Sequence, residues 1–300
     1  MVAITTPTRA KRPADETLVA PRSYLGEVRV RFMTKRAGVG ALGVLAVIAV
    51  TAVAAPLLTP HDPLAGRATE RLLPIGAAGH LLGTDEQGRD MLTRLLYAGR
   101  LSLVTGTMPV LIATILGTAI GATAGYLRGP LGAVLMRSMD MLYAFPAVML
   151  AIAVAASLGP GVNNSILAIS IVFIPPIARV AEAATRRVVL LEYIEAARLS
   201  GASTARIIVS QVLANIFNPI FVYASGLVGL SIVIASGLSF LGLGAAPPTP
   251  EWGYMLNSLR GAIYTQPWVA VLPGLFIFAT SMACNVVSDA LRDALDVKDA

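Results

Sequence analysis

Residues 195–207 read EAARLSGASTARI and lie between two long apolar segments. Their alanines and leucine, with Glu195 and Arg198 three residues apart, favour a short helix. Gly201 is placed to adopt the left-handed conformation that commonly ends a helix, and Ser203 can cap a second one. The stretch therefore predicts a helix–turn–helix loop, although by local physics alone an ordinary polar loop fits these residues about equally well.

The composition places this loop in a membrane protein. Hydrophobic residues make up 56% of the 300 residues and charged residues only 13%, whereas soluble domains carry about 25% charged residues. The mean hydropathy is +0.73. So few charges could not cover the surface of a water-soluble globule of this length, and we expect lipid to solvate most of the chain.

Long apolar runs predict six transmembrane helices, because one span needs about 20 apolar residues and helices satisfy their own backbone groups. Region 141–178 is too long for one span, and the turn-forming residues 157–164 (SLGPGVNN) divide it into two. The first run could be mistaken for a signal peptide, but its length favours a retained anchor. The fold class is therefore all-α integral membrane. The expected spans are 38–58, 101–127, two within 141–178, about 217–242 and about 268–290.

The basic residues set the expected orientation. Most of the 23 lysines and arginines fall in the N-terminal tail and in alternate connections on one side of the six spans. The positive-inside rule then places both termini and the Glu195 loop in the cytoplasm. Aromatic rings favour membrane boundaries, so the outer boundary is expected to hold Trp252, Tyr254, Tyr264 and Trp268.

These spans divide the chain into segments. The Thr-, Pro- and Arg-rich first 24 or so residues are expected to be disordered. The expected segments are a cytoplasmic tail at 1–36, a first transmembrane helix at 37–58, an extracytoplasmic segment at 59–100, a five-helix core at 101–291 with the polar loop near 186–212, and a cytoplasmic tail at 292–300.

The extracytoplasmic segment contains an amphipathic stretch with Thr93 and Arg94 on its polar face, which predicts an interfacial helix before the second span. Thr84 or Asp85 could cap its start. Three acids nearby match no EF-hand-like loop, and the only two histidines are far apart, so we expect no metal site. The apolar face consists of Met91, Leu92, Leu95 and Leu96, the acids are Asp85, Glu86 and Asp90, and the histidines are His61 and His80.

Gly117, Gly121 and Gly125 recur every four residues and so share one helix face, a possible helix-packing stripe. Small residues at that spacing let two helix backbones approach closely. The partner could be another helix of this chain or a second subunit, and the sequence does not separate the two.

Two acids lie near the ends of apolar runs, each three residues from an arginine. Ion pairs between them at that helical spacing are expected. The pairs are Asp140 with Arg137 and Asp289 with Arg292. No apolar run holds a central acid with a partner, which leaves a proton or sodium relay without an obvious carrier.

Catalytic motifs are missing from the sequence. There is no G-x-x-x-x-G-K-[ST] loop, and the only lysines are Lys11, Lys35 and Lys298, so the chain itself is not expected to hold ATP in that way. We therefore expect a non-enzymatic protein without a cofactor of its own.

Glu195, Ala196 and Ala197 with Gly201 resemble the EAA loop of ATP-binding-cassette importer permeases. The stretches at 80–103 (HLLGTDEQGRDMLTRLLYAGRLSL), 238–262 (LSFLGLGAAPPTPEWGYMLNSLRGA) and 267–296 resemble the oligopeptide/dipeptide branch, specifically the second of its two permeases. The EAA letters alone are weakly specific, but these blocks follow in order over about 30–298. The chain departs from the usual pattern at Gln211 and Ala214, where the family commonly has histidine and proline.

The resemblance implies a type I importer permease with a cytoplasmic coupling helix in a bacterial cell membrane. Its implied partners are a second permease, two cytoplasmic ATPases that bind ATP and magnesium, and an extracytoplasmic peptide-binding lipoprotein. By this resemblance the residues that couple the permease to the ATPases are Glu195, Ala196, Ala197 and Gly201. The implied cargo is a short peptide.

Three alternatives stay open at this stage. The same architecture could import nickel or another small solute. An ion-driven secondary transporter would need a midplane ionisable pair or broken helices, and a non-transporting membrane scaffold is the third.

Overall fold

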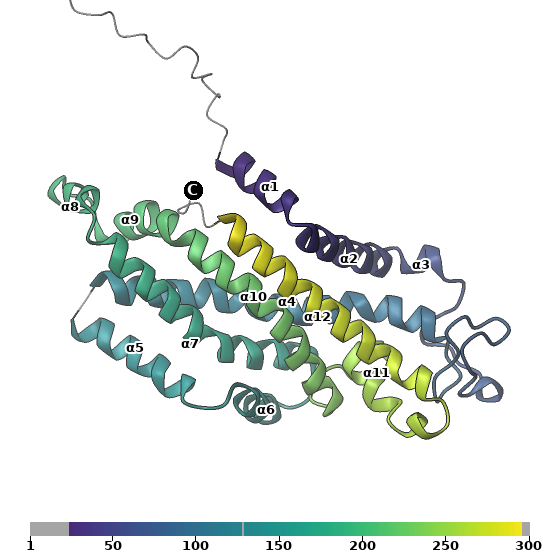
Figure 1. Cartoon of the computed structure of the whole chain (residues 1–300). Coiled ribbons are helices and arrows are strands. Elements are labelled where there is room, and N and C mark those ends of the chain that lie inside the picture. Colours follow the sequence, from purple (N-terminus) through teal and green to yellow (C-terminus); the bar gives the residue numbers. More distant parts are fainter. Residues whose placement is uncertain (1–23, 128, 296–300) are drawn as a thin grey trace, which may run out of the picture.

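The described part of the chain is an elongated bundle of helices. The computed structural model describes residues 24–127 and 129–295, and these contain no β-strand longer than an isolated bridge. Figure 1 shows the long helices side by side, with the α8–α9 connection at one end and residues 59–90 at the other. The expectations for residues 1–23 and 296–300 lie outside the described residues.

The N-terminal part of the chain supplies three long helices and several short ones. Its helical elements are α1 (Tyr24–Thr34), α2 (Arg36–Val53), α3 (Ala55–Leu58), a 3₁₀ turn (Ala68–Glu70), α4 (Met91–Leu127), α5 (Pro130–Tyr143), α6 (Ala147–Leu158) and α7 (Val162–Val188).

The C-terminal half contains the polar loop and two more long helices. Its helical elements are α8 (Glu192–Leu199), α9 (Thr204–Ile207), a π-helical turn (Ile208–Val212), α10 (Leu213–Phe240), α11 (Trp252–Ser258), a 3₁₀ turn (Gly261–Tyr264) and α12 (Pro267–Leu295).

Five helices of the described ranges are long and apolar enough to cross a membrane, and a sixth span results if the bent pair α5 and α6 counts as one. The two members of this pair meet at an angle of 91°. The predicted start of the third span at residue 141 is therefore wrong, since helix already begins at Pro130 and breaks after Tyr143. With only 12 residues, α6 is too short to cross a bilayer by itself.

The glycine stripe packs against α7 of the same chain. A Cβ built on Gly121 would lie 2.1 Å from the carbonyl oxygen of Ala178, and one on Gly117 would lie 2.8 Å from that of Ile174. A Cβ on Gly125 would meet the Glu182 carbonyl oxygen at 2.9 Å. Only residues without a side chain allow α4 and α7 to approach this closely along their length.

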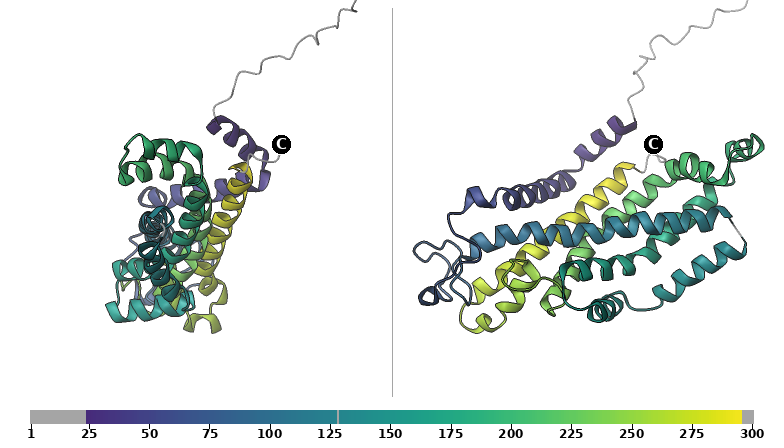
Figure 2. Two further views of the ribbon diagram at one scale, coloured as in Figure 1. Left: turned by 90° about the vertical axis from the view of Figure 1, so that its left-hand side faces the viewer. Right: turned by 180° about the vertical axis from the view of Figure 1, so that it is seen from behind.

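The first apolar run is a packed helix of the bundle. Helix α2 lies against α12 and α4, as the view from behind in Figure 2 shows. Arg100 of α4 donates hydrogen bonds of 2.7 Å to the carbonyl oxygens of Ala52 and Val53. These contacts satisfy carbonyls in the last turn of α2, which have no partner within the helix.

The predicted interfacial helix at 91–97 is wrong as a separate element, because these residues form the first turns of the 37-residue helix α4. Its expected polar face is also wrong, since Thr93 and Arg94 are fully buried. Arg94 donates from Nη1 to the Pro63 carbonyl at 2.7 Å, and its Nε lies 3.3 Å from Asp85 Oδ2. Loop residues thus cover the face of α4 that the spacing of apolar residues alone would assign to solvent.

Asp90, rather than Thr84 or Asp85, caps α4. Its Oδ2 accepts hydrogen bonds from the Thr93 backbone N–H at 2.8 Å and from the Thr93 hydroxyl at 2.7 Å. Burial acts to raise the pKa of Asp90, but the hydrogen bonds from Thr93 and His80 outweigh it and hold the pKa below its ordinary value. Asp85 instead binds Arg89 within the loop, at 2.7 Å.

A second apolar core closes the end of the bundle near residues 59–90. It joins the start of α4 to α11 and α12 around Trp252, which is fully buried and donates from Nε1 to the Leu95 carbonyl at 3.0 Å. Trp252 is therefore enclosed by protein, whereas a boundary role of the kind expected needs a ring that faces the lipid headgroups. Tyr264 and Trp268 are strongly exposed.

The predicted ion pairs are also revised. Asp140 pairs with Arg179 of α7 rather than with Arg137 of its own helix. Within the described ranges Asp289 forms no ion pair with Arg292, and both line a pocket of about 450 Å³ beside Ser288. A spacing of three residues allowed both predicted pairs within one helix, but the tertiary structure places Asp140 against α7.

Candidate functional site

The polar loop forms two short helices at one end of the bundle. Helix α8 begins after the extended residue Leu191 and ends at Leu199. Gly201 has φ of +80°, its N–H donates to the Arg198 carbonyl at 3.0 Å, and the Ala202 N–H donates to the Ala197 carbonyl at 3.2 Å. This pair of bonds is the Schellman ending of a helix, in which a left-handed residue reverses the chain.

The second short helix starts as the sequence indicates. The Ser203 hydroxyl accepts a hydrogen bond from the Arg206 N–H at 3.4 Å, and α9 begins at the next residue. The chain then passes through the π-helical turn, which contains Gln211, into α10 without a break. Ala214 keeps its backbone N–H, so α10 does not need to end or kink there as a proline would require.

One face of the loop is fixed to the bundle. Ile194 and Ile207 are buried in the main core together with Val188 and Val189. On the same side, Arg198 Nε donates to the Tyr126 hydroxyl at 3.0 Å, and its guanidinium lies 4.7 Å from the centroid of that ring. Tyr126 is the penultimate residue of α4, so the loop is tied directly to the longest helix.

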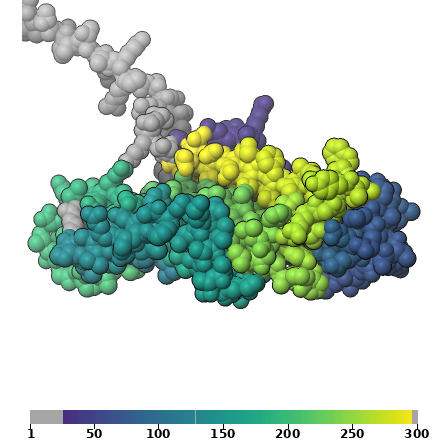
Figure 3. All heavy atoms as spheres, turned by 90° about the horizontal axis from the view of Figure 1, so that it is seen from below, coloured from purple at the N-terminus to yellow at the C-terminus, as the bar shows by residue number. Residues whose placement is uncertain are grey.

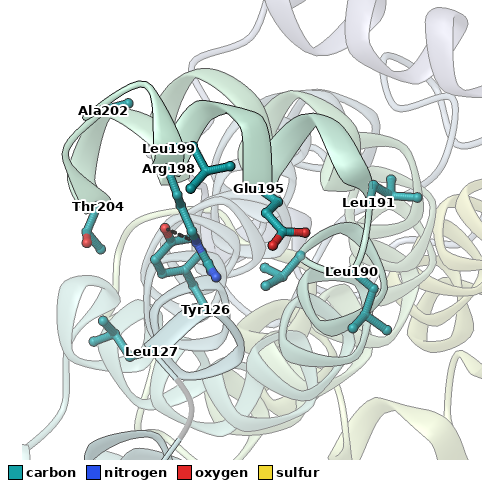
Figure 4. Close-up of a pocket in the computed structure, with 10 residues that line it drawn as sticks. Tyr126, Leu127, Leu190, Leu191, Glu195, Arg198, Leu199, Ala202 and Thr204 are labelled. Carbon is teal, nitrogen blue, oxygen red and sulfur yellow. Dashed lines mark hydrogen bonds between the residues drawn. The ribbon is translucent and has the colours of Figure 1, made fainter.

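Beside this anchor, a part of the loop is open. A pocket of about 730 Å³ lies between α8, the end of α4 and the residues that follow α7. Figure 4 shows the side chains of Glu195 and Arg198 extending from α8 toward Tyr126 in this pocket. Ala196 is exposed and Ala197 is partly buried. The arrangement combines a rigid anchor with a small-residue surface that another protein could approach closely.

Sequence reasoning did not identify the residues that line the inner cavities. One cavity of about 370 Å³ lies where the α5–α6 bend faces α7 and α10. Its lining is largely aromatic and aliphatic, and it includes Tyr143, Phe145, Phe173 and Tyr223. Such residues read as ordinary membrane-helix residues in the sequence, and only the bend after Tyr143 brings them together.

Comparison with known proteins places this architecture in a family. Residues 117–298 match the family model described as binding-protein-dependent transport system inner membrane component. Residues 23–74 match the N-terminal TM domain of oligopeptide transport permease C.

Named relatives align over most of the chain. The di/tripeptide transport system permease protein of Pseudomonas aeruginosa is 41% identical over 290 residues, 95% of each chain. The glutathione transport system permease protein of Pectobacterium atrosepticum is 43% identical over 244 residues, 81% of each chain. The dipeptide transport system permease protein of Haemophilus influenzae is 35% identical over 284 residues, which cover 93% of this chain and 96% of the relative.

The helical spans, the loop of two short helices joined at Gly201 and these matches all point to the same family. This chain therefore belongs to the family of binding-protein-dependent transport system inner membrane components, within its oligopeptide/dipeptide branch of ATP-binding-cassette permeases.

Proposed function

We propose that this chain forms half of the translocation pathway of an ATP-driven importer of short peptides. The named relatives carry dipeptides, tripeptides and glutathione, itself a tripeptide. In this proposal a second permease forms the other half, two cytoplasmic ATPases supply the energy, and an extracytoplasmic binding protein delivers the peptide. This chain performs no hydrolysis and holds no cofactor of its own.

The observation that carries the proposal is the construction of the α8–α9 loop. Its inner face is anchored by Ile194 and by the bond from Arg198 to Tyr126, while Glu195 and Ala196 remain exposed. A loop that can move only with α4 and α7 is suited to pass a displacement from a docked ATPase into the bundle. We assign this coupling role to Glu195, Ala196, Ala197 and Gly201.

Substitutions in the loop test this role. With Glu195→Lys or Gly201→Asp, we expect ATP-dependent uptake of a labelled dipeptide to be lost while the chain still reaches the membrane. Reversing the charge of Glu195 alters the exposed docking face, and an aspartate at 201 adds a charge at the tip of the bend. Uptake is measured in vesicles that contain the complete transporter, and the membrane level of the chain is measured by immunoblot.

Two matched variants serve as controls. Gly201→Asn is nearly isosteric with Gly201→Asp, and asparagine tolerates the left-handed conformation. A Cβ at this position meets nothing within 4 Å, so uptake should be largely retained. Glu192→Lys makes the same charge reversal one turn earlier on α8, outside the pocket, and should also retain uptake. Normal uptake by both Glu195→Lys and Gly201→Asp would refute the coupling role.

A further inference from the structure

Two histidines and an aspartate come together at the end of the bundle opposite α8, in the loops between α3 and α4. His61, His80 and Asp90 each offer one ligand atom, and these atoms all lie within 4.8 Å of one another. His80 Nδ1 is 2.9 Å from Asp90 Oδ1, and the two imidazole rings stack with centroids 5.0 Å apart. The histidines are 19 residues apart in the sequence, so only the loop fold reveals the cluster.

The outer nitrogen of each imidazole already has a partner. His61 Nε2 lies 3.0 Å from the Gly79 carbonyl oxygen, and a carbonyl can only accept, so this nitrogen carries the proton. His80 Nε2 lies 3.5 Å from Glu70 Oε2. Metal-bound histidines almost always direct their second nitrogen at a carbonyl or carboxylate in this way. His80 Nδ1 is hydrogen-bonded to Asp90 Oδ1, and a bound ion would take the place of that hydrogen bond with both atoms as its ligands.

The carboxylate is equally well positioned. Asp90 is buried, and its Oδ2 is held by the backbone N–H and the hydroxyl of Thr93. Its Oδ1 therefore faces His80. Because Asp90 is fixed by the first turn of α4, a metal bound here would be attached directly to that helix.

The site has room for an ion and for water. A pocket of about 190 Å³ is lined by both histidines, Asp90 and Glu70, and His61 is partly exposed at its edge. Two imidazoles and one carboxylate suit Zn²⁺ and its transition-metal neighbours, whereas Mg²⁺ and Ca²⁺ favour oxygen ligands. Three protein ligands leave the fourth tetrahedral position for water.

We propose that His61, His80 and Asp90 form a binding site for a single divalent transition-metal ion of the Zn²⁺ class. Glu70 and the Gly79 carbonyl act as positioning groups that orient the two rings. A bound ion would join the loop after α3, the turn before Gly83 and the start of α4. Neither the coupling role nor the identity of the cargo enters this inference.

Zinc binding by the purified chain tests the proposal. The full-length protein is prepared in detergent through an affinity tag without histidine or cysteine, stripped with a chelator and dialysed against Zn²⁺. We expect one equivalent of Zn²⁺ to remain bound to the wild-type chain. His61→Ala should weaken this binding by at least about tenfold, the loss typical even of an outer-sphere change.

The variants are chosen so that misfolding does not imitate loss of the site. His61 is partly exposed, and its one hydrogen bond is to Gly79, so His61→Ala should keep the thermal stability of the metal-free chain. Asp62→Asn alters the neighbouring acid of the same pocket and should bind Zn²⁺ as the wild type does. Failure of the wild type to retain Zn²⁺, or unchanged binding by His61→Ala, would overturn the proposal.

Discussion

At the scale of single residues, glycine decides how closely two helices approach. The stripe on α4 meets backbone carbonyls of α7, and the tightest contact is at Gly121, where an added Cβ would lie 2.1 Å from the Ala178 oxygen. The sequence supplied the spacing of the stripe but not its partner, since either an internal helix or a second subunit fits the same pattern. In the structure the partner is α7 of the same chain.

Gly121→Ala should therefore destabilise the bundle. Overpacking of a tight interior costs about 1–3 kcal/mol, because α4 and α7 would have to separate along their length. The measurement is the thermal unfolding temperature of the purified chain in detergent. Gly43→Ala on α2 is the matched control, since a Cβ there meets nothing within 4 Å; an equal loss in both variants would contradict the packing role.

At the scale of elements, local signals were predictable and non-local ones were not. The end of α8 at Gly201 and the cap by Ser203 follow from residues within a few positions of each other, and the structure has both. The Asp140–Arg179 pair joins residues 39 apart, and the buried Arg94 contacts the Pro63 carbonyl and Asp85. Such contacts depend on tertiary packing, which periodicity does not describe.

The same limit applies to the candidate site. The two short helices of the loop and the turn at Gly201 were predicted from the sequence, whereas the Arg198–Tyr126 contact and the histidine cluster were not. Tyr126 lies 72 residues before Arg198, and nothing in the local pattern links them. Tyr126 is a single aromatic residue at the end of an apolar run, and it gave no signal of this contact in the sequence.

The local stability of α8 should depend on Ile194, the one side chain of this helix that is completely buried. Ile194→Ala removes that anchor, and large-to-small changes in a core cost about 2–5 kcal/mol. We expect faster hydrogen exchange in α8 and its flanking turns, with α12 unchanged. Leu199→Ala, on the same helix but 84% exposed, should leave the exchange of α8 as it is; similar exchange in both variants would show that Ile194 does not anchor the loop.

At the scale of the whole molecule, the bundle is longer than the apolar core of a bilayer is thick. Helix α4 has 37 residues and is about 55 Å long at 1.5 Å per residue, whereas the apolar core of a bilayer is about 30 Å thick. The helix must therefore extend beyond the bilayer. Figure 3 shows the segment from residue 59 to the start of α4 at one extremity and α8 with α9 at the other.

The proposed orientation predicts that these extremities lie on opposite sides of the membrane. Leu81→Cys and Ser200→Cys, each made in a Cys284→Ser background, place single thiols at exposed positions of the two ends. A membrane-impermeant maleimide should label the thiol at 81 in intact spheroplasts and the thiol at 200 only after permeabilisation. Labelling of position 200 in intact spheroplasts would place the loop outside and remove the proposed ATPase contact.

The elbow between α5 and α6 has a consequence for the surroundings of this chain. Every helix end leaves amide and carbonyl groups that the helix itself cannot pair, and Pro146 has no N–H to offer at the break. Lipid tails supply no hydrogen bonds, so interrupted backbone at membrane depth persists only when protein encloses it or water reaches it. Residues 143–149 are exposed on this chain, so an elbow at membrane depth must face a wet passage or a neighbouring subunit, and a solitary copy of this chain in a bilayer would then be incomplete on that side.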